Sequence, residues 1–213
     1  MNWHWAPHVH AAMHGDDLVV LDVRRNDYLL LAAVGDAVQL APDSNAAQIH
    51  EDDLVNQLEA ARLGARSQGV APATRNRAPS AERDLFDHGV PPLRMAQVAE
   101  LAALSVRVTH SLRWTPLSRL VRSSPVQGGE DVFEVVRKAM VLRAALPWLP
   151  LQGECLYRAA LLRAHLGRLA GHTHWVFGVS TWPFSAHCWV QSGGVVLNDR
   201  LQRVRRFTPI LAV

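Results

Sequence analysis

The 213-residue sequence has few of the features that secreted or membrane-spanning proteins need. Its two cysteines, Cys155 and Cys188, are too few for a disulfide framework, so each thiol needs its own explanation. No apolar run approaches the roughly 18 residues that cross a membrane. The first 17 residues also lack the basic start and apolar core of a signal peptide. We therefore expect a globular, cytoplasmic protein without a membrane partner.

Lysine is nearly absent, since Lys138 is the only one, and charge is divided unevenly along the chain. Residues 1–70 carry four arginines against ten acidic residues, whereas residues 71–213 carry eighteen basic against nine acidic residues. This asymmetry predicts two units with different tasks. The acidic first unit lacks the basic patch that displaces counterions from nucleic acid, so we expect no nucleic-acid partner.

The first unit has the pattern of a hairpin followed by helices. Apolar runs at residues 18–23 and 28–31 flank a polar turn, which predicts a β-hairpin. Helices are expected at residues 34–40 and 51–63, and the second has acidic residues in its first turn and apolar residues at helical spacing. These elements predict a small winged-helix-like module.

Three segments follow from the pattern along the chain. Residues 1–68 form the first unit, residues 69–90 are a linker rich in proline and small residues, and residues 91–213 form a second unit. The second unit is expected to be α+β, with helices packed on an antiparallel sheet. Its expected helices cover residues 93–104, 106–112, 131–145 and 153–169. Its expected strands cover residues 174–180, 186–191, 195–199 and 205–210.

Cys155 lies at the expected start of a helix, just after a break at residues 150–153. With Ala159 and Leu162 it opens an apolar stripe that faces inward. At that end, free backbone N–H groups and the helix dipole favour a thiolate and can hold an oxyanion. A buried core cysteine is the common alternative.

A hairpin supplies a histidine and an aspartate. Alternation in residues 186–191 puts His187 and Trp189 on one face. A three-residue loop at 192–194 pairs His187 with Asp199, whereas a two-residue loop pairs it with Arg200 instead. An imidazole held by a carboxylate can take the proton of a thiol, so the sequence predicts Cys155, His187 and Asp199 as a catalytic triad.

The remaining candidate ligands do not predict a metal site. Since His187 and Cys188 point to opposite faces of a strand, they cannot easily share a zinc ion, and no CxxC or HExxH spacing is present. We expect no metal and no cofactor. By the same alternation, Cys188 is expected to be a small core residue, while Trp189 is expected to wall the site beside His187.

From Cys155 onward the sequence resembles the transglutaminase-like leader peptidases of lasso peptide biosynthesis. The resemblance rests on CLYRA at 155–159, WVFGV at 175–179, PFSAHCWV at 183–190 and VLND at 196–199. It covers roughly residues 90–213, and residues 1–70 resemble more weakly the leader-recognition domain that many such proteins carry. It implies a papain-like cysteine peptidase that binds the leader of a ribosomally made precursor and hydrolyses the leader–core bond. An ATP-dependent lasso cyclase is then the implied partner.

The resemblance also implies where the leader binds. It would add a strand beside residues 27–31 and pack against the helix at residues 51–63, by main-chain hydrogen bonds with side-chain pockets. The candidate contacts are Tyr28, Leu29, Leu30, Asp52, Leu54, Val55 and Leu58. Gln152 is a candidate oxyanion-hole side chain.

Two other functions share much of this pattern. A non-catalytic adaptor would deliver a precursor peptide to another enzyme, although the intact Cys, His and Asp argue against it. An acyltransferase would use the same nucleophile and thioester, but pass the acyl group to an amine instead of water.

Overall fold

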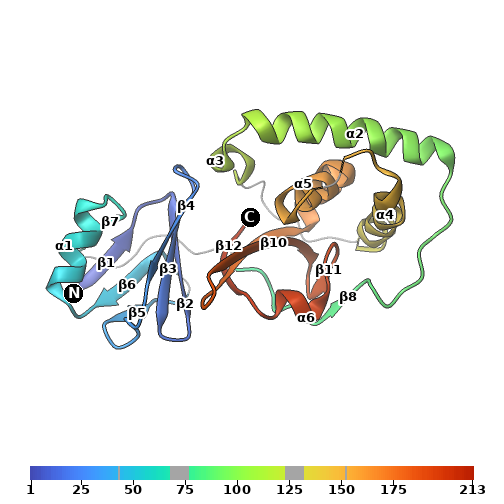
Figure 1. The fold of residues 1–213 in the computed structure, drawn as a ribbon. Helices are drawn as coiled ribbons and strands as arrows, with labels where there is room; N and C mark the ends of the chain where they lie inside the picture. Colours follow the sequence, from blue (N-terminus) through green and yellow to red (C-terminus); the bar gives the residue numbers. More distant parts are fainter. Residues whose placement is uncertain (43, 68–76, 123–131, 152) are drawn as a thin grey trace.

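The computed structural model describes residues 1–42, 44–67, 77–122, 132–151 and 153–213. Two units lie side by side, an N-terminal unit of residues 1–67 and a C-terminal unit of residues 77–213 (Figure 1). Within these ranges, no helix combines the length and the apolar character needed to cross a membrane.

The N-terminal unit is built mainly from strands. Its two antiparallel sheets have the strand orders β5-β6-β1-β7 and β2-β3-β4. The elements are β1 (Asn2–Trp5), β2 (Val9–His14), β3 (Asp17–Asp22), β4 (Asp27–Leu31), β5 (Val38–Leu40), β6 (Ala46–Ile49), α1 (Asp52–Ala60) and β7 (Gly64–Arg66).

The predicted hairpin is present as β3 and β4, and the later predicted helix is present as α1. The helix predicted at residues 34–40 was wrong. Only one turn forms there, closed by the carbonyl of Val34, and the chain then enters β5. Helix nucleation is costly, and Gly35 and Asp36 are poor helix formers, so pairing with β6 prevails. The unit therefore has fewer helices than the sequence pattern suggested.

The β2-β3-β4 sheet is buried on both faces, which explains the unbroken apolar run in β3. Leu18 and Val20 pack into the core of the N-terminal unit. Val19 and Leu21 point the other way and join the core of the C-terminal unit, where they are fully buried. A strand covered on both sides needs apolar residues at consecutive positions. The sheet thus joins the two units through a shared core.

The C-terminal unit has a five-stranded sheet in the order β12-β9-β10-β11-β8. Helix α5 packs on β10, and α2 and α4 pack on α5, so the helices form a layer over one face (Figure 1). The first elements are β8 (Arg83–Asp84), α2 (Met95–Trp114), α3 (Leu117–Leu120), α4 (Val132–Ala145) and the short η1 (Leu146–Trp148). The remaining elements are α5 (Cys155–Leu166), η2 (Gly167–His172), β9 (His174–Ser180), β10 (Ser185–Ser192), β11 (Val195–Val196), α6 (Leu201–Val204) and β12 (Thr208–Ala212).

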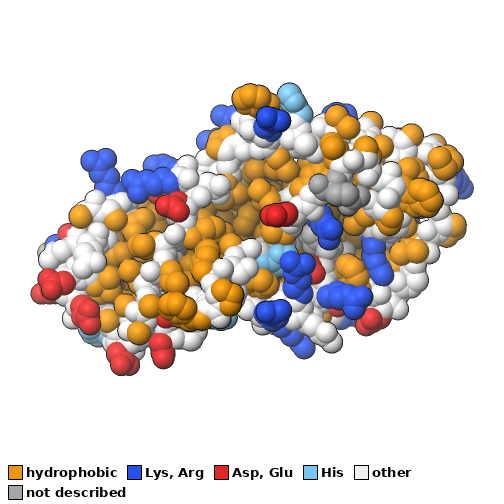
Figure 2. Space-filling view, in the orientation of Figure 1, with side chains coloured by type: hydrophobic (Ala, Val, Ile, Leu, Met, Phe, Trp, Pro, Cys, Tyr) orange, Lys and Arg blue, Asp and Glu red, His pale blue; other side chains and the backbone are white. Residues whose placement is uncertain are grey.

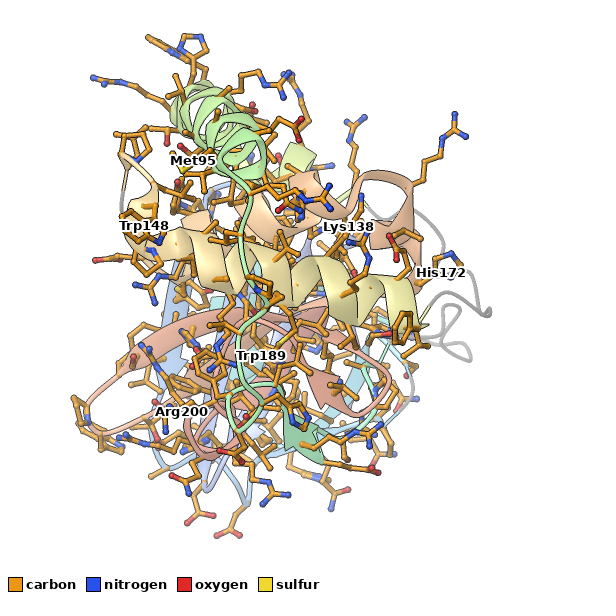
Figure 3. All side chains as sticks on the ribbon, turned by 90° about the vertical axis from the view of Figure 1, so that its right-hand side faces the viewer. Met95, Lys138, Trp148, His172, Trp189 and Arg200 are labelled. Carbon is orange, nitrogen blue, oxygen red and sulfur yellow. The ribbon has the colours of Figure 1, made fainter. Side chains whose placement is uncertain are left out.

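This arrangement confirms the α+β class. One difference is that α2 is a single helix where the pattern predicted two. Ser105, the expected break, is fully buried, and its hydroxyl donates to the carbonyl of Ala102 at 2.7 Å, so the helix continues through it. Met95 at the start of α2 and Trp148 after α4 lie on the outer side of the helical layer (Figure 3).

The predicted linker is only partly described, since residues 69–76 lie outside the described ranges. Its later part packs on the C-terminal unit. The carbonyl of Pro79 accepts a hydrogen bond from Gln191 Nε2, β8 pairs in parallel with β11, and Leu85 is buried. The segment boundaries given above remain predictions.

Candidate active site

Cys155 is the first residue of α5, where the sequence placed it. The first N–H groups of a helix have no acceptor within the helix. The side chain of Glu154, which precedes α5, does not cap them either. Ala159, Leu162 and Leu166 continue the stripe and are buried, which anchors the helix on the sheet. Cys155 as a whole residue is partly exposed. A rigid helix therefore presents Cys155 at its positive end.

His187 comes from β10 and is hydrogen-bonded to Asp199, with 2.5 Å between His187 Nε2 and Asp199 Oδ2. Asp199 Oδ1 accepts from the backbone N–H of Arg200 at 2.7 Å, which fixes the carboxylate. The thiol of Cys155 lies close enough to His187 for each group to shift the pKa of the other. Because Nε2 is engaged by Asp199, Nδ1 is the nitrogen left for the thiol. The structure thus brings all three predicted catalytic residues together.

The register that led to this pairing was nevertheless wrong. The loop has two residues, Gly193 and Gly194, with Gln191 opposite Val196. Gly193, not Gly194, takes the positive φ of 54°, as the first residue of a type II′ turn requires. Continued to its end, this ladder would set His187 opposite Arg200, not Asp199.

Asn198 ends the ladder before that point. The N–H of Leu197 still donates to the carbonyl of Val190, but the N–H of Val190 donates to the side-chain oxygen of Asn198 at 2.8 Å. An amide side chain thus replaces a backbone acceptor, and the chain leaves the sheet after β11. Asp199 is thereby free to reach His187. Sequence reasoning missed Asn198, although a short amide next to Asp199 was a visible signal.

Two aromatic rings hold the His187 imidazole. Phe207 lies 5.0 Å away between ring centroids, and Trp189 lies 6.2 Å away and stacks on it. Trp189 is buried, and its Nε1 donates to Gln191 Oε1 at 2.7 Å. Trp189 therefore stacks on His187 and also lines an interdomain cavity. Phe207 was not foreseen, because it lies far along the chain from His187.

The site favours a thiolate–imidazolium pair. Hydrogen bonds from the Cys188 thiol, from His187 and from the backbone of Cys188 outweigh burial and lower the pKa of Cys155 to about 4. Burial opposes protonation of His187, but Asp199 and Cys155 raise its pKa above the ordinary value. Burial likewise opposes the charge of Asp199, yet His187 and Arg200 hold its pKa low. Between the lowered pKa of Cys155 and the raised pKa of His187, Cys155 is therefore negative and His187 positive.

Cys188 is a core residue, as predicted, with 3% of its surface exposed. It packs in the core shared with α5, and its thiol contacts Cys155. The hydrogen bond to Cys155, followed by burial, raises the pKa of Cys188, so this thiol stays protonated. The sequence showed that Cys188 points away from His187, but not that it meets Cys155.

The other predicted site residues differ in placement. Leu54, Val55 and Leu58 belong to the core of the N-terminal unit, and α1 packs on β6 and β7. Asp52 is exposed on α1. Strand β4 pairs with β3 along one of its edges. Gln152 lies outside the described residues.

The three β4 candidates alternate between two faces. Leu29 is 40% exposed, whereas Tyr28 and Leu30 pack against the C-terminal unit. Tyr28 therefore faces the C-terminal unit and does not lie on an open face of the N-terminal unit.

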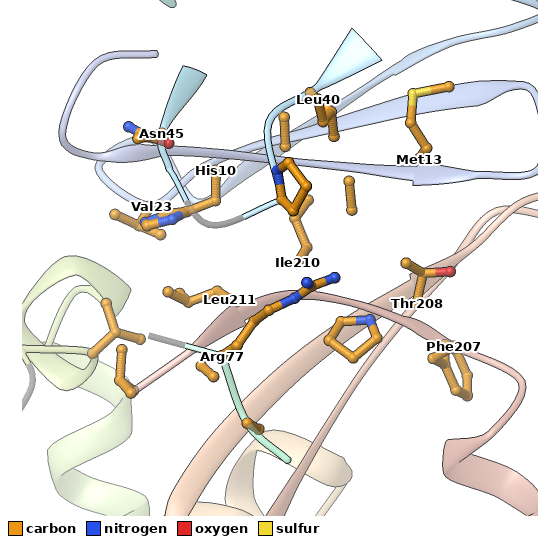
Figure 4. A pocket seen from close by; sticks show the side chains of 18 of the residues that line it. His10, Met13, Val23, Leu40, Asn45, Arg77, Phe207, Thr208, Ile210 and Leu211 are labelled. Carbon is orange, nitrogen blue, oxygen red and sulfur yellow. The ribbon is translucent and has the colours of Figure 1, made fainter. Parts of the chain in front are cut away.

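A large cavity of about 1990 Å³ lies between the units, away from the thiol. It is bounded by His10 and Met13 of β2 on one side, and by Thr208 and Ile210 of β12 on the other (Figure 4). Cys155, His187 and Asp199 do not line it. Trp189, which stacks on His187, does line it.

Comparison with known proteins gives a family match. The family described as "Transglutaminase-like superfamily" matches residues 98–212, which is more than half of the chain and contains Cys155, His187 and Asp199. No curated protein and no solved structure matches the chain significantly.

Proposed function

Because this chain belongs to the transglutaminase-like superfamily, we propose that it is a cysteine peptidase that removes the leader from a ribosomally made lasso peptide precursor. Members of this superfamily are usually enzymes that act through an active-site cysteine, as peptidases or as acyltransferases. The observation that carries the proposal is the contact of Cys155 with His187, which is itself 2.5 Å from Asp199. A thiolate with a charged imidazole beside it is the nucleophile of such enzymes.

The reaction follows from these groups. The Cys155 thiolate attacks the carbonyl at the leader–core junction, and first-turn N–H groups of α5 hold the oxyanion. His187 gives its proton to the departing amine of the core, leaving the leader as a thioester on Cys155. Water then loses a proton to His187 and adds to the thioester. Collapse expels the Cys155 thiolate and releases the leader, whose new carboxylic acid loses its proton to solvent, and the thiolate–imidazolium pair is restored.

The proposed partners are the precursor leader and an ATP-dependent lasso cyclase, which the sequence resemblance implies. Strand β4 pairs only with β3 among the described strands, so its outer edge is open to a peptide strand. Strand addition gives affinity through main-chain hydrogen bonds. Since α1 lies against β6 and β7, we place the leader on β4 alone, without the helix contact expected from sequence.

The test is cleavage of a precursor encoded beside the gene, followed by mass spectrometry. Wild-type protein should make one cut that gives leader and core, and Cys155→Ala and His187→Ala should abolish it. His110→Ala is the matched control, because His110 lies exposed on α2. In H₂¹⁸O, hydrolysis puts one labelled oxygen in the new leader carboxylate.

Two results would replace the proposal. Binding of the precursor without any cut, with the cyclase present, would favour the adaptor. A leader amide formed with an added amine, in place of the labelled carboxylate, would favour the acyltransferase.

A further inference from the structure

Tyr28 belongs to β4 of the N-terminal unit, yet it lies at the active site of the C-terminal unit. Its ring centroid is 5.5 Å from that of Phe184, three residues before His187. Burial, followed by electrostatic interaction with Cys188 and Cys155, raises the pKa of Tyr28 to about 12. The hydroxyl therefore lies within electrostatic reach of both thiols and stays neutral. The proposed reaction gives this ring no role.

Phe184 is also unexplained by the reaction. It keeps 42% of its surface exposed beside β10, although a large apolar ring gains free energy from burial. Figure 2 shows hydrophobic side chains gathered in the hollow between the two units, on the side where β4 approaches the C-terminal unit. Tyr28 and Phe184 thus contribute aromatic surface from opposite units.

The two rings are held in fixed positions. Tyr28 is opposite Leu21 in the hairpin, and Leu21 is fully buried in the shared core. On the other side, Trp182 Nε1 donates to Asp17 Oδ2 at 2.8 Å. Trp182 also has a φ of 54°, which is uncommon for a bulky residue and indicates a loop held by its partner. The β9–β10 loop is therefore tied to the N-terminal unit just before Phe184.

We propose that Tyr28 and Phe184 form an apolar wall of the substrate cleft beside Cys155, and that this wall selects an apolar substrate side chain next to the scissile bond. An aromatic surface binds apolar groups by burial and ring contacts. The Cys155 thiolate makes the same region unfavourable for an acidic side chain. The N-terminal unit then completes the active site in addition to any leader binding.

This wall also connects leader binding with cleavage. A peptide added to the open edge of β4 would lie beside the strand that carries Tyr28, whose ring reaches the thiol region. The leader would then need only a short stretch of chain between its strand and Cys155. The inference rests on the proposed peptidase, and its test separates the two.

The first experiment measures kcat/KM on short peptides that span the junction but lack the leader. Tyr28→Ala should lower kcat/KM for a peptide with an apolar residue before the cut by roughly tenfold or more. It should also reduce the preference over a matched peptide with Asp at that position. Tyr28→Phe should keep both, because the ring remains. Phe133→Ala is the control, since Phe133 is 80% exposed on α4.

If Tyr28→Ala cleaves leaderless peptides as wild type does, Tyr28 is not part of a substrate-selecting wall. A loss confined to leader-dependent cleavage would lead to the same conclusion. Thermal unfolding identifies a variant that fails to fold. In that case Phe184→Leu is tested instead, because it removes the ring that contacts Tyr28 but keeps an apolar side chain there. This variant should also lose preference for the apolar peptide, to a smaller extent. Equal preference in wild type and Phe184→Leu would then overturn the proposal.

A second readout needs no peptidase activity. The rate of Cys155 alkylation by N-benzyl chloroacetamide is divided by the rate with chloroacetamide, for wild type and Tyr28→Ala. A lower benzyl-to-parent rate ratio in Tyr28→Ala than in wild type supports the wall. If that result is found but no precursor is cleaved, only the peptidase proposal fails. An unchanged ratio contradicts the wall, whatever the enzyme does with peptides.

Discussion

Replacing Cys188 by alanine should raise the pH at which Cys155 ionises. The Cys188 thiol gives the largest stabilisation of the Cys155 thiolate, through a hydrogen bond, ahead of His187. Removing that donor disfavours the charged form of Cys155, so its pKa must rise. The replacement is small and apolar in a core position that is 3% exposed, so the packing should change little.

The size of the effect follows from the energy of such a bond. A hydrogen bond to a charged group contributes about 1.5–3 kcal/mol. One pKa unit corresponds to about 1.36 kcal/mol, so the pKa should rise by about one to two units. Starting from about 4, the ionisation midpoint should therefore move to about 5–6. Cys188→Ser keeps an O–H donor and should stay close to wild type.

The assay is the rate of Cys155 alkylation by iodoacetamide as a function of pH, with the site assigned by mass spectrometry. The absolute rate is a poor measure, because nucleophilicity falls as the pKa of a thiol falls. The midpoint of the pH profile is direct. In wild type Cys188 should remain unmodified, being buried and protonated. An alanine variant with the wild-type midpoint would refute the role of Cys188, and a serine variant that shifts equally would refute the donor argument.

Three further predictions concern the pH dependence, the sheet end and the shared core. The pH profile of kcat/KM should rise near pH 4, where Cys155 ionises. It should fall only above the ordinary histidine range, because His187 has a raised pKa and must keep its proton for the leaving amine. A fall in kcat/KM below that range would contradict the thiolate–imidazolium pair. Asn198→Ala should lower the free energy of unfolding by about 1–3 kcal/mol, since the N–H of Val190 loses its acceptor, and should lower kcat/KM by releasing Asp199. Asn198→Asp keeps an acceptor, so its free energy of unfolding, measured by chemical denaturation, should fall less than that of Asn198→Ala. Leu21→Ala should cost about 2–5 kcal/mol by leaving a cavity between the units, whereas Leu29→Ala, on the exposed side of β4, should change stability by less than about 0.5 kcal/mol.

Local features of the chain were predictable where short-range rules decide them. Cys155 begins a helix because a break precedes an apolar stripe, and the structure has it as the first residue of α5. The β3–β4 hairpin and strand β9 also follow from apolar runs with turn residues between them. The helix expected at residues 34–40 failed because pairing with β6, a non-local partner, outweighed a weak local preference.

Contacts between distant segments were not predictable from one sequence. The pairing of His187 with Asp199 was expected from a register that the structure does not have, and it depends on Asn198 ending the ladder. Phe207 reaches the site from the residue position just before β12, and Tyr28 reaches it from β4 of the N-terminal unit. No periodicity marks such residues, since their role depends on how separate elements pack.

In the proposed reaction Cys155 carries the leader as a thioester. The most direct measurement is rapid acid quenching of enzyme with precursor, followed by intact and peptide mass spectrometry. We expect a transient adduct with the mass of the leader acyl group on Cys155, absent in Cys155→Ala. Leader release that continues in Cys155→Ala, or an adduct on another residue, would contradict it.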